Sequence, residues 1–102
     1  MIKKKSSKPL DREALTMAAE CLKAIAHPSR LQIIQLLLTG RRYSVNELAQ
    51  ICELSQPSAS DHLRLMQRCG FLTSTRDGRT VYYEILEDHL YDLMTCIQKR
   101  FG

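Results

Sequence analysis

The stretch over residues 54–70, LSQPSASDHLRLMQRCG, is rich in side chains that can hydrogen-bond to the edges of bases. On a helix with about 100° per residue, Ala59, Leu63 and Met66 fall on one face, and the polar side chains fall on the other. The opposite, polar face holds Gln56, Ser60, Asp61, Arg64 and Arg68. An amide such as Gln56 can pair with adenine, and short hydroxyls can pair with either base type or with phosphate. The pattern predicts a helix that enters the DNA major groove by its N-terminal end, where the helix dipole also favours an anion near Ser55. An ordinary exposed helix start is the alternative.

Two further arginines flank the dipeptide Asp77-Gly78, which is typical of a two-residue hairpin loop. In such a hairpin Arg76 and Arg79 would lie directly opposite each other, where like charges destabilise the pairing. A DNA phosphate would relieve this repulsion. The alternative is a solvated pair of arginines that is screened by Asp77.

Helices and a hairpin must position these side chains. The apolar spacing predicts helices over 11–26 and 28–38, separated by His27-Pro28, since proline disfavours a helical residue before it. Ser44 with Glu47 predicts a capping box that starts a helix over 44–52, and Ser55 is a suitable N-cap for the next helix. Alternating residues predict strands over 71–76 and 79–85, and a last helix is expected over 87–101.

The predicted fold is therefore mainly α with a small β-hairpin, in the order helix, helix, helix, helix, strand, strand, helix. With 102 residues, the chain is expected to form one domain over residues 10–102, after a disordered basic tail over residues 1–9. The net charge of +4 comes from that tail, because its four lysines leave 11 basic and 11 acidic residues in the rest. DNA affinity must therefore come from local clusters of charge.

Three segments carry a resemblance to a known family: IAHPSRLQIIQLLL, SVNELAQICELSQPSASDHLRLMQRCGFL and RDGRTVYYEI. In this order and spacing the chain resembles the ArsR/SmtB family of winged helix-turn-helix repressors, over roughly residues 15–100. The resemblance implies a homodimer through the first and last helices. It also implies a repressor that leaves double-stranded operator DNA when a metal ion or a modified thiol pair binds. The symmetry of such a dimer predicts an operator with an inverted repeat.

Carried onto this sequence, the resemblance makes Gln56, Ser58, Ser60 and Asp61 the base-facing positions, and residues 76–79 the wing. His62 is expected beside the DNA face. Family members often have His where Asp61 stands, and a carboxylate there repels phosphate but can accept a hydrogen bond from cytosine. We expect Asp61 to narrow specificity without abolishing binding.

The sensor is less well defined, because the cysteine pairs of arsenic-responsive and sulfur-responsive members are missing. No CxxC spacing is present, so the four cysteines are expected to be thiols, with Cys52 and Cys69 in packing roles. The possible sensor residues are Cys21 and Cys96, which lie on the two helices that pair in the family. With His89 they could form a metal site or a dithiol switch, or they could be small apolar residues in a helix interface. A zinc site of the family type is not expected.

The favoured function is a dimeric transcriptional regulator, a repressor with no certain cofactor and a metal ion as a candidate. The rivals are a winged-helix module that binds protein, and a DNA-binding regulator without an inducer. An enzyme is not expected, because there is no nucleophile–base pairing and no glycine-rich phosphate loop. No apolar run is long enough to span a membrane and no signal peptide is evident, which predicts a cytoplasmic protein.

Overall fold

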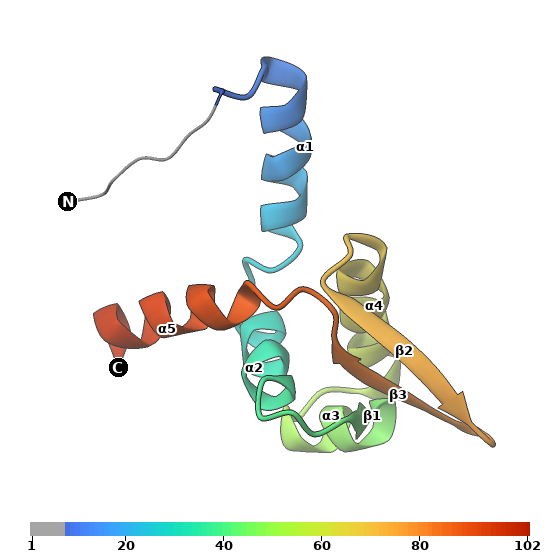
Figure 1. The fold of residues 1–102 in the computed structure, drawn as a ribbon. Coiled ribbons are helices and arrows are strands. Elements are labelled where there is room, and N and C mark those ends of the chain that lie inside the picture. Colours follow the sequence, from blue (N-terminus) through green and yellow to red (C-terminus); the bar gives the residue numbers. More distant parts are fainter. Residues whose placement is uncertain (1–7) are drawn as a thin grey trace.

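A computed structural model describes residues 8–102, so most of the expected basic tail lies outside the described residues. The elements in chain order are α1 (Arg12–Lys23), α2 (Pro28–Leu37), β1 (Tyr43–Ser44), α3 (Val45–Ile51), α4 (Gln56–Arg68), β2 (Leu72–Asp77), β3 (Thr80–Ile85) and α5 (Leu90–Phe101). Figure 1 shows α2, α3, α4 and the sheet gathered into one body, while α1 and α5 project from it in different directions. Five helices and a small sheet confirm the predicted fold class.

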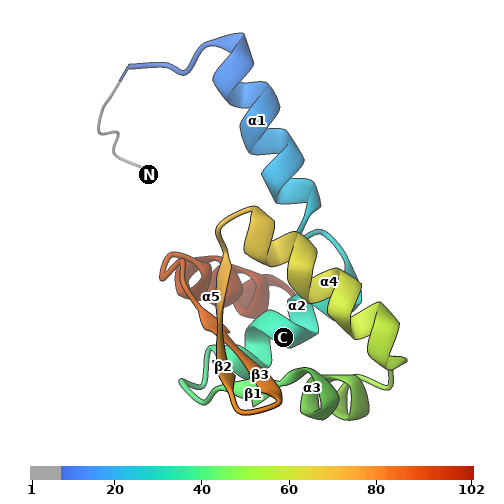
Figure 2. The same ribbon diagram turned by 90° about the vertical axis from the view of Figure 1, so that its right-hand side faces the viewer.

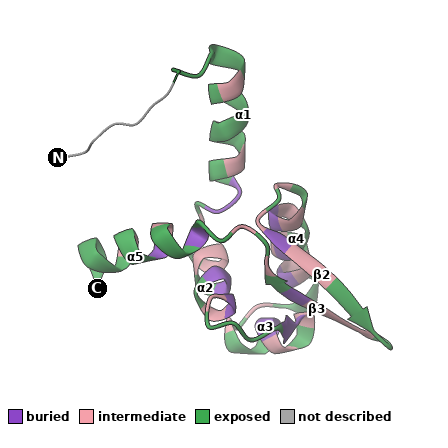
Figure 3. Ribbon diagram, in the orientation of Figure 1, coloured by how far each residue is buried: buried purple, intermediate pink, exposed green. Residues whose placement is uncertain are grey.

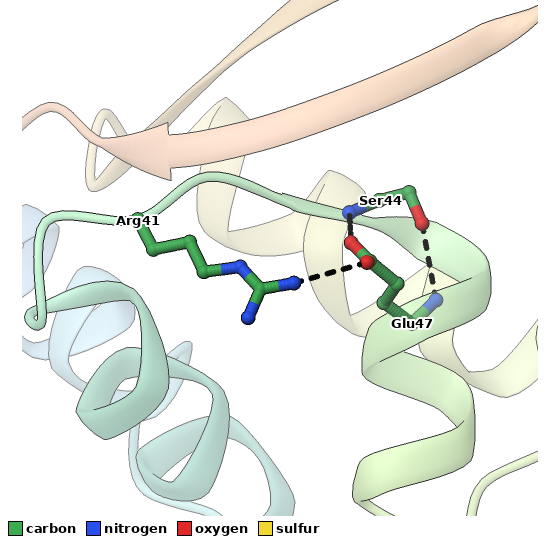
Figure 4. A network of polar contacts seen from close by, with 3 residues as sticks. All are labelled: Arg41, Ser44 and Glu47. Carbon is green, nitrogen blue, oxygen red and sulfur yellow. Dashed lines mark hydrogen bonds and ion pairs between the residues drawn. The ribbon is translucent and has the colours of Figure 1, made fainter.

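Side-chain caps start α1, α3 and α4 where the sequence predicts them. The Asp11 carboxylate accepts from the Ala14 N–H at 2.8 Å at the start of α1. At α3, Ser44 Oγ accepts from the Glu47 N–H at 3.1 Å, and the Glu47 carboxylate accepts from the Ser44 N–H at 2.9 Å (Figure 4). This is a complete capping box, which satisfies two backbone donors that the helix itself cannot. Arg41 adds an ion pair to Glu47 at 3.2 Å.

The core lies between α2, α4 and the sheet. Helix α2 buries Ile33, Ile34 and Leu37, and α4 buries the predicted face of Ala59, Leu63 and Met66. The projecting helices differ from this pattern. No residue of α1 is buried, and α5 buries only Leu90 and Met94 (Figure 3). Their apolar stripes are therefore open in the single protomer, with Leu15 50%, Leu22 57% and Phe101 77% exposed.

The sheet has three antiparallel strands in the order β1-β3-β2, and the short strand β1 was not predicted. The predicted loop of the hairpin is wrong by one residue. Asp77 pairs with Thr80, so the two-residue loop is Gly78-Arg79, and Arg76 pairs with Val81 instead of Arg79. Gly78 has φ +67° and Arg79 does not have a positive φ, which suits a turn with glycine first. The predicted repulsion between directly opposed arginines is therefore absent from this pairing.

The last helix begins at Leu90, three residues after the predicted start. The N–H groups of Leu90 and Tyr91 bond to the carbonyls three residues earlier, so a tight turn precedes α5. The Glu87 carboxylate also accepts from the His89 N–H at 3.1 Å, which holds this turn in place. Among the described residues, no helix combines the length and the apolar character that crossing a membrane requires.

Candidate nucleic-acid interface

Helix α4 presents its predicted polar face outward. Gln56, Asp61 and Arg64 are exposed, and Ser58 and Ser60 are half-exposed. The Ser55 hydroxyl accepts from the Ser58 N–H at 3.2 Å, so Ser55 is an N-cap and its oxygen is occupied. The predicted N-cap is thus confirmed, and a role of Ser55 in anion binding would depend on its remaining hydroxyl hydrogen.

The start of α4 offers few free backbone donors to an anion. The second helical residue is Pro57, which has no N–H, and the Ser58 N–H bonds to the cap. The Ala59 N–H bonds to the Ser55 carbonyl at 2.9 Å. Side chains rather than backbone N–H groups are therefore the main hydrogen-bonding groups that this turn offers to a ligand.

An exposed ion pair lies on the same face. Arg64 Nη2 donates to Asp61 Oδ1 at 2.8 Å, and the side chains are 59% and 75% exposed. The pair shields the carboxylate that the sequence placed at a base-facing position. Because the pair is exposed, water and salt screen it, and DNA can compete for either partner.

His62 is turned inward, away from the position expected for a contact with the DNA backbone. Its Nδ1 accepts from Arg30 Nε at 3.0 Å, and its ring lies 4.8 Å from the ring of His27. Burial lowers the pKa of His62, and the positive charge of Arg30 and the neighbouring His27 lower it further, against the opposing effect of Asp61. The ring is thus engaged within the protein through Nδ1.

The tip of the hairpin and the first turns of α4 line one hollow on the surface. The hollow is lined by Ser44, Val45, Asn46, Gln56, Ser60, Arg79, Thr80 and Val81. It joins the amide and hydroxyl of α4 to the arginine at the tip of the hairpin. Figure 2 shows the elements that line the hollow. The hairpin lies beside α3, and α4 begins after the turn that follows α3. The structure thus unites Gln56, Ser60 and Arg79, whereas Arg76 is exposed on β2 outside this lining.

Two residues of this region were missed by the sequence reasoning. Asn46 lines the hollow from the first turn of α3. Arg42 stacks its guanidinium 3.9 Å from the centre of the Tyr82 ring and pairs with Asp77 at 3.5 Å, so it braces the wing from the side of β1. Asn46 follows the N-cap Ser44 by two residues, so the predicted capping box already placed its polar side chain in the first turn of a helix next to the candidate interface. Nothing local to Arg42 indicated its partners, because they lie more than thirty residues further along the chain.

The four thiols lie in different surroundings in the protomer. Cys21 is half-buried, and the thiol beside it in the protomer is that of Cys69, at the end of α4. Burial raises the pKa of Cys69, and the neighbouring Cys21 raises it further. Cys96 is exposed on α5. Cys52 packs against the core, as predicted, and burial raises the pKa of its thiol. A sensor role of Cys21 and Cys96 stays a prediction.

The described residues of one protomer do not fit a metal ion. Across residues 8–102, no three His, Cys, Asp or Glu side chains are grouped so that they could hold one. His89 instead has its Nδ1 2.6 Å from the Glu87 carboxylate, and this contact raises the pKa of His89. A pair of ligands is too few for a tetrahedral site, so the weak candidates His89 and Cys96 are not brought into such a set.

Helices α3 and α4 are joined by a short turn, α4 has one exposed polar face, and the β2–β3 hairpin lies beside them. This arrangement defines a winged helix-turn-helix protein. Residues 27–74 match the family described as bacterial regulatory protein, arsR family, and the chain belongs to this family. This confirms the resemblance seen in the sequence and places the chain among regulatory proteins rather than enzymes.

Three known proteins illustrate the similarity. The chain is 38% identical to the HTH-type transcriptional repressor SmtB of Mycobacterium tuberculosis over 82 residues, which are 80% of this chain and 60% of that protein. It is 40% identical to the transcriptional activator HlyU of Vibrio cholerae, over 82% of this chain and 77% of the relative. A solution structure of a homodimeric winged helix-turn-helix DNA-binding domain from Mycobacterium bovis superimposes with a TM-score of 0.73 at 28% identity, covering 91% of this chain and 87% of that one. The match to SmtB spans less than two thirds of that repressor.

Proposed function

We propose that the protein is a sequence-specific DNA-binding transcriptional repressor that acts in the cytoplasm as a homodimer on an inverted-repeat operator. The observation that carries this proposal is the hollow that joins Gln56 and Ser60 of α4 to Arg79 of the wing. An amide and a hydroxyl suit base edges in the major groove, and a guanidinium suits a phosphate beside it. Of the two relatives described above, SmtB is a repressor and HlyU is an activator, and the proposed direction of regulation follows SmtB.

The open apolar stripes support the dimer. α1 exposes Leu15, Met17 and Leu22, and α5 exposes Tyr91 and Phe101. Apolar side chains spaced along two helices that project from the body are suited to pack against a second copy. The similar structure from Mycobacterium bovis is described as homodimeric. A symmetric dimer would present two α4 helices to half-sites about one helical turn, roughly 34–36 Å, apart or a multiple of that.

The test is selection of a duplex from a random-sequence pool by the full chain, followed by measurement of its affinity as salt is raised. We expect an inverted repeat, and an affinity that falls steeply and linearly on a log–log plot, because several phosphates are neutralised. Sedimentation should show a dimer at the concentrations used. No enrichment of any sequence, together with a flat response to salt, would instead favour a winged-helix module that binds protein, for which the neutral charge of the body and Asp61 are the supporting features.

The proposal for regulation names the residues that would sense an inducer and does not choose between a thiol modification and a metal ion. Cys96 is exposed and Cys21 is half-buried, so reagents could reach Cys96 directly. We propose Cys21 and Cys96 as the sensor residues. A DNA-binding regulator without an inducer is the competing form of the same function, and the cysteine variants described in the Discussion separate the two.

A further inference from the structure

One guanidinium joins three helices. Arg30, in the first turn of α2, donates from Nη1 to the carbonyl oxygens of Lys23 and Ala24 at 3.2 Å and 3.3 Å, at the end of α1. It donates from Nε to His62 Nδ1 at 3.0 Å, in the middle of α4. The Arg30 side chain is therefore a direct polar link between the projecting helix α1 and the helix that carries the DNA-reading side chains.

This link matters because α1 has few other contacts with the body, among them that of Cys21 with Cys69 at the end of α4. None of the α1 residues is buried, and its apolar side chains point into solvent in the protomer. Only the two residues that follow the helix, Ala24 and Ile25, enter the core, at 3% and 4% exposure. Figures 1 and 2 show α1 standing clear of the remaining helices along most of its length. The angle between α1 and α4 thus depends on the short junction that Arg30 occupies, together with the contact between Cys21 and Cys69.

The junction works only while His62 is neutral. Nδ1 can accept the Arg30 hydrogen only if it carries no proton, and a charged imidazole has protons on both nitrogens. A second histidine has the same requirement, because His27 Nδ1 accepts from the Ser29 N–H at 3.1 Å and caps α2. The groups that face His62 are Arg30 and His27 from the start of α2 and Asp61 from its own helix. A protonated His62 would place a second positive charge beside the Arg30 guanidinium, and its Nδ1 could no longer accept the Arg30 hydrogen.

We propose that Arg30 and His62 are positioning residues that hold the recognition helix α4 at a set angle to the dimerisation helix α1, and that protonation of His62 opens this link and weakens DNA binding. The inference rests on the proposed function, since it concerns the placement of two α4 helices in one dimer. A symmetric dimer reads two half-sites at once, so a change in the angle between α1 and α4 displaces both reading helices.

The proposal predicts that acidification lowers the affinity for DNA, whereas the added positive charge of histidine alone would raise it. Protonation of histidine adds positive charge, which by itself strengthens attraction to DNA phosphates. The proposal instead requires affinity to fall as the pH drops below the ordinary histidine pKa of 6.5, because His62 resists protonation while the link is intact. A loss of affinity on acidification is therefore diagnostic.

The experiment measures the affinity of the full chain for a duplex that the wild-type protein has selected from a random pool at about pH 8. Affinity is then followed down to about pH 5.5 by fluorescence anisotropy, with circular dichroism and sedimentation at each pH. For the wild type we expect affinity to fall about fivefold to tenfold, as suits the loss of one hydrogen bond of ordinary net strength, with fold and dimer retained.

Three variants assign the effect to His62. His62→Asn places an amide oxygen near the site of Nδ1 and cannot titrate, so it should keep the affinity measured at high pH and show a flat profile. His27→Asn preserves the cap acceptor but leaves His62 in place, so it should keep the pH dependence. Arg30→Met should weaken binding at every pH without dissociating the dimer.

The outcomes separate the inference from the proposed function. If the wild type selects no duplex at about pH 8, the proposed function fails and the inference falls with it. If the wild type binds DNA but more tightly in acid, or if His62→Asn keeps the wild-type profile, the inference alone is overturned. A flat profile in His27→Asn would also overturn it, because the titrating group would then be the cap of α2.

Discussion

Asp61 and Arg64 form an ion pair of 2.8 Å on the exposed face of α4, at the positions where the helix would meet DNA. One member of the pair can accept a hydrogen bond from cytosine, and the other can donate to a phosphate. Because both side chains are exposed, their contribution to folding is small, in the range of about 0–1 kcal/mol for surface pairs. The pair is therefore expected to affect recognition more than stability.

Replacing Asp61 with His tests its effect on specificity. We expect Asp61→His to strengthen binding to non-cognate duplexes and to reduce the preference at the base that the carboxylate contacts, since one repulsive charge is removed and one acceptor is lost. The measurement is affinity for the selected duplex and for its single-base variants, with Glu84→Gln as a control for a carboxylate on β3. Equal tightening on all sequences would show that Asp61 has no part in discrimination.

Gln56→Ala tests base recognition by α4. The amide lies in the hollow that also contains Arg79, and its loss should cost about 1–3 kcal/mol for the selected site while relaxing the preference at one base pair. Gln50→Ala, on the exposed side of α3, is the matched control and should bind normally. If Gln56→Ala weakens binding to every sequence by the same factor, the side chain contacts phosphate rather than a base.

The two wing arginines should differ. Arg79 lies in the loop and lines the hollow, whereas Arg76 lies on β2 opposite Val81. We expect Arg79→Ala to lower affinity uniformly across sequences and to reduce the slope of the log–log salt plot by about one. Arg76→Ala should have a smaller effect on both. Equal losses in the two variants would contradict the placement of Arg79 alone at the hollow.

The capping box should make stability depend on acid. The backbone N–H of Ser44 holds the pKa of Glu47 below its usual value of 4.5, with a further contribution from Arg41. A carboxyl group with a lowered pKa stabilises the fold above its unfolded pKa, and this contribution is lost as the pH falls through the folded pKa. Denaturant unfolding of Glu47→Gln should therefore lose less stability than the wild type between about pH 5 and 3.

A second variant separates the cap from the charge. Ser44→Ala removes the hydroxyl that accepts from the Glu47 N–H, and it should cost about 0.5–2 kcal/mol at neutral pH. An unchanged free energy of unfolding in Ser44→Ala would mean that water replaces the cap at no cost. Parallel pH profiles for Glu47→Gln and the wild type would show that the capping carboxylate has no part in the acid dependence.

The cysteine variants test the sensor. If Cys21 and Cys96 respond to an inducer, metals or oxidants that release the wild type from DNA should leave the double variant Cys21→Ser/Cys96→Ser bound. Cys69→Ser is the informative control, because Cys69 lies beside Cys21 in the protomer. Release of the double variant at the wild-type concentration of reagent would remove those thiols as the sensor. Protection in Cys69→Ser would point to the thiol pair that the fold itself brings together.

Much of this architecture is local, and so it is visible in the chain. Asp11, Ser44 and Ser55 cap helices through contacts with residues three positions away. The buried face of α4 follows from helical periodicity alone. The predicted candidates Gln56, Ser60 and Arg79 come from two such local patterns, a polar helix face and a hairpin tip. Their meeting at one hollow is not a local property, because it depends on how the wing packs beside α3 and α4.

The amino-acid sequence by itself determined the order of the five helices and the hairpin, the starts of the first four helices and the residues offered to DNA, because these depend on neighbours within a turn of helix or a hairpin. The dipeptides Asp77-Gly78 and Gly78-Arg79 both suit a two-residue loop, so the hairpin register was read only from the structure, in which Asp77 pairs with Thr80. The tertiary structure also decided the role of His62, whose partner Arg30 is 32 residues away. Long-range packing turned a side chain expected at the DNA into a contact between helices, and no periodicity in the chain reports such a contact.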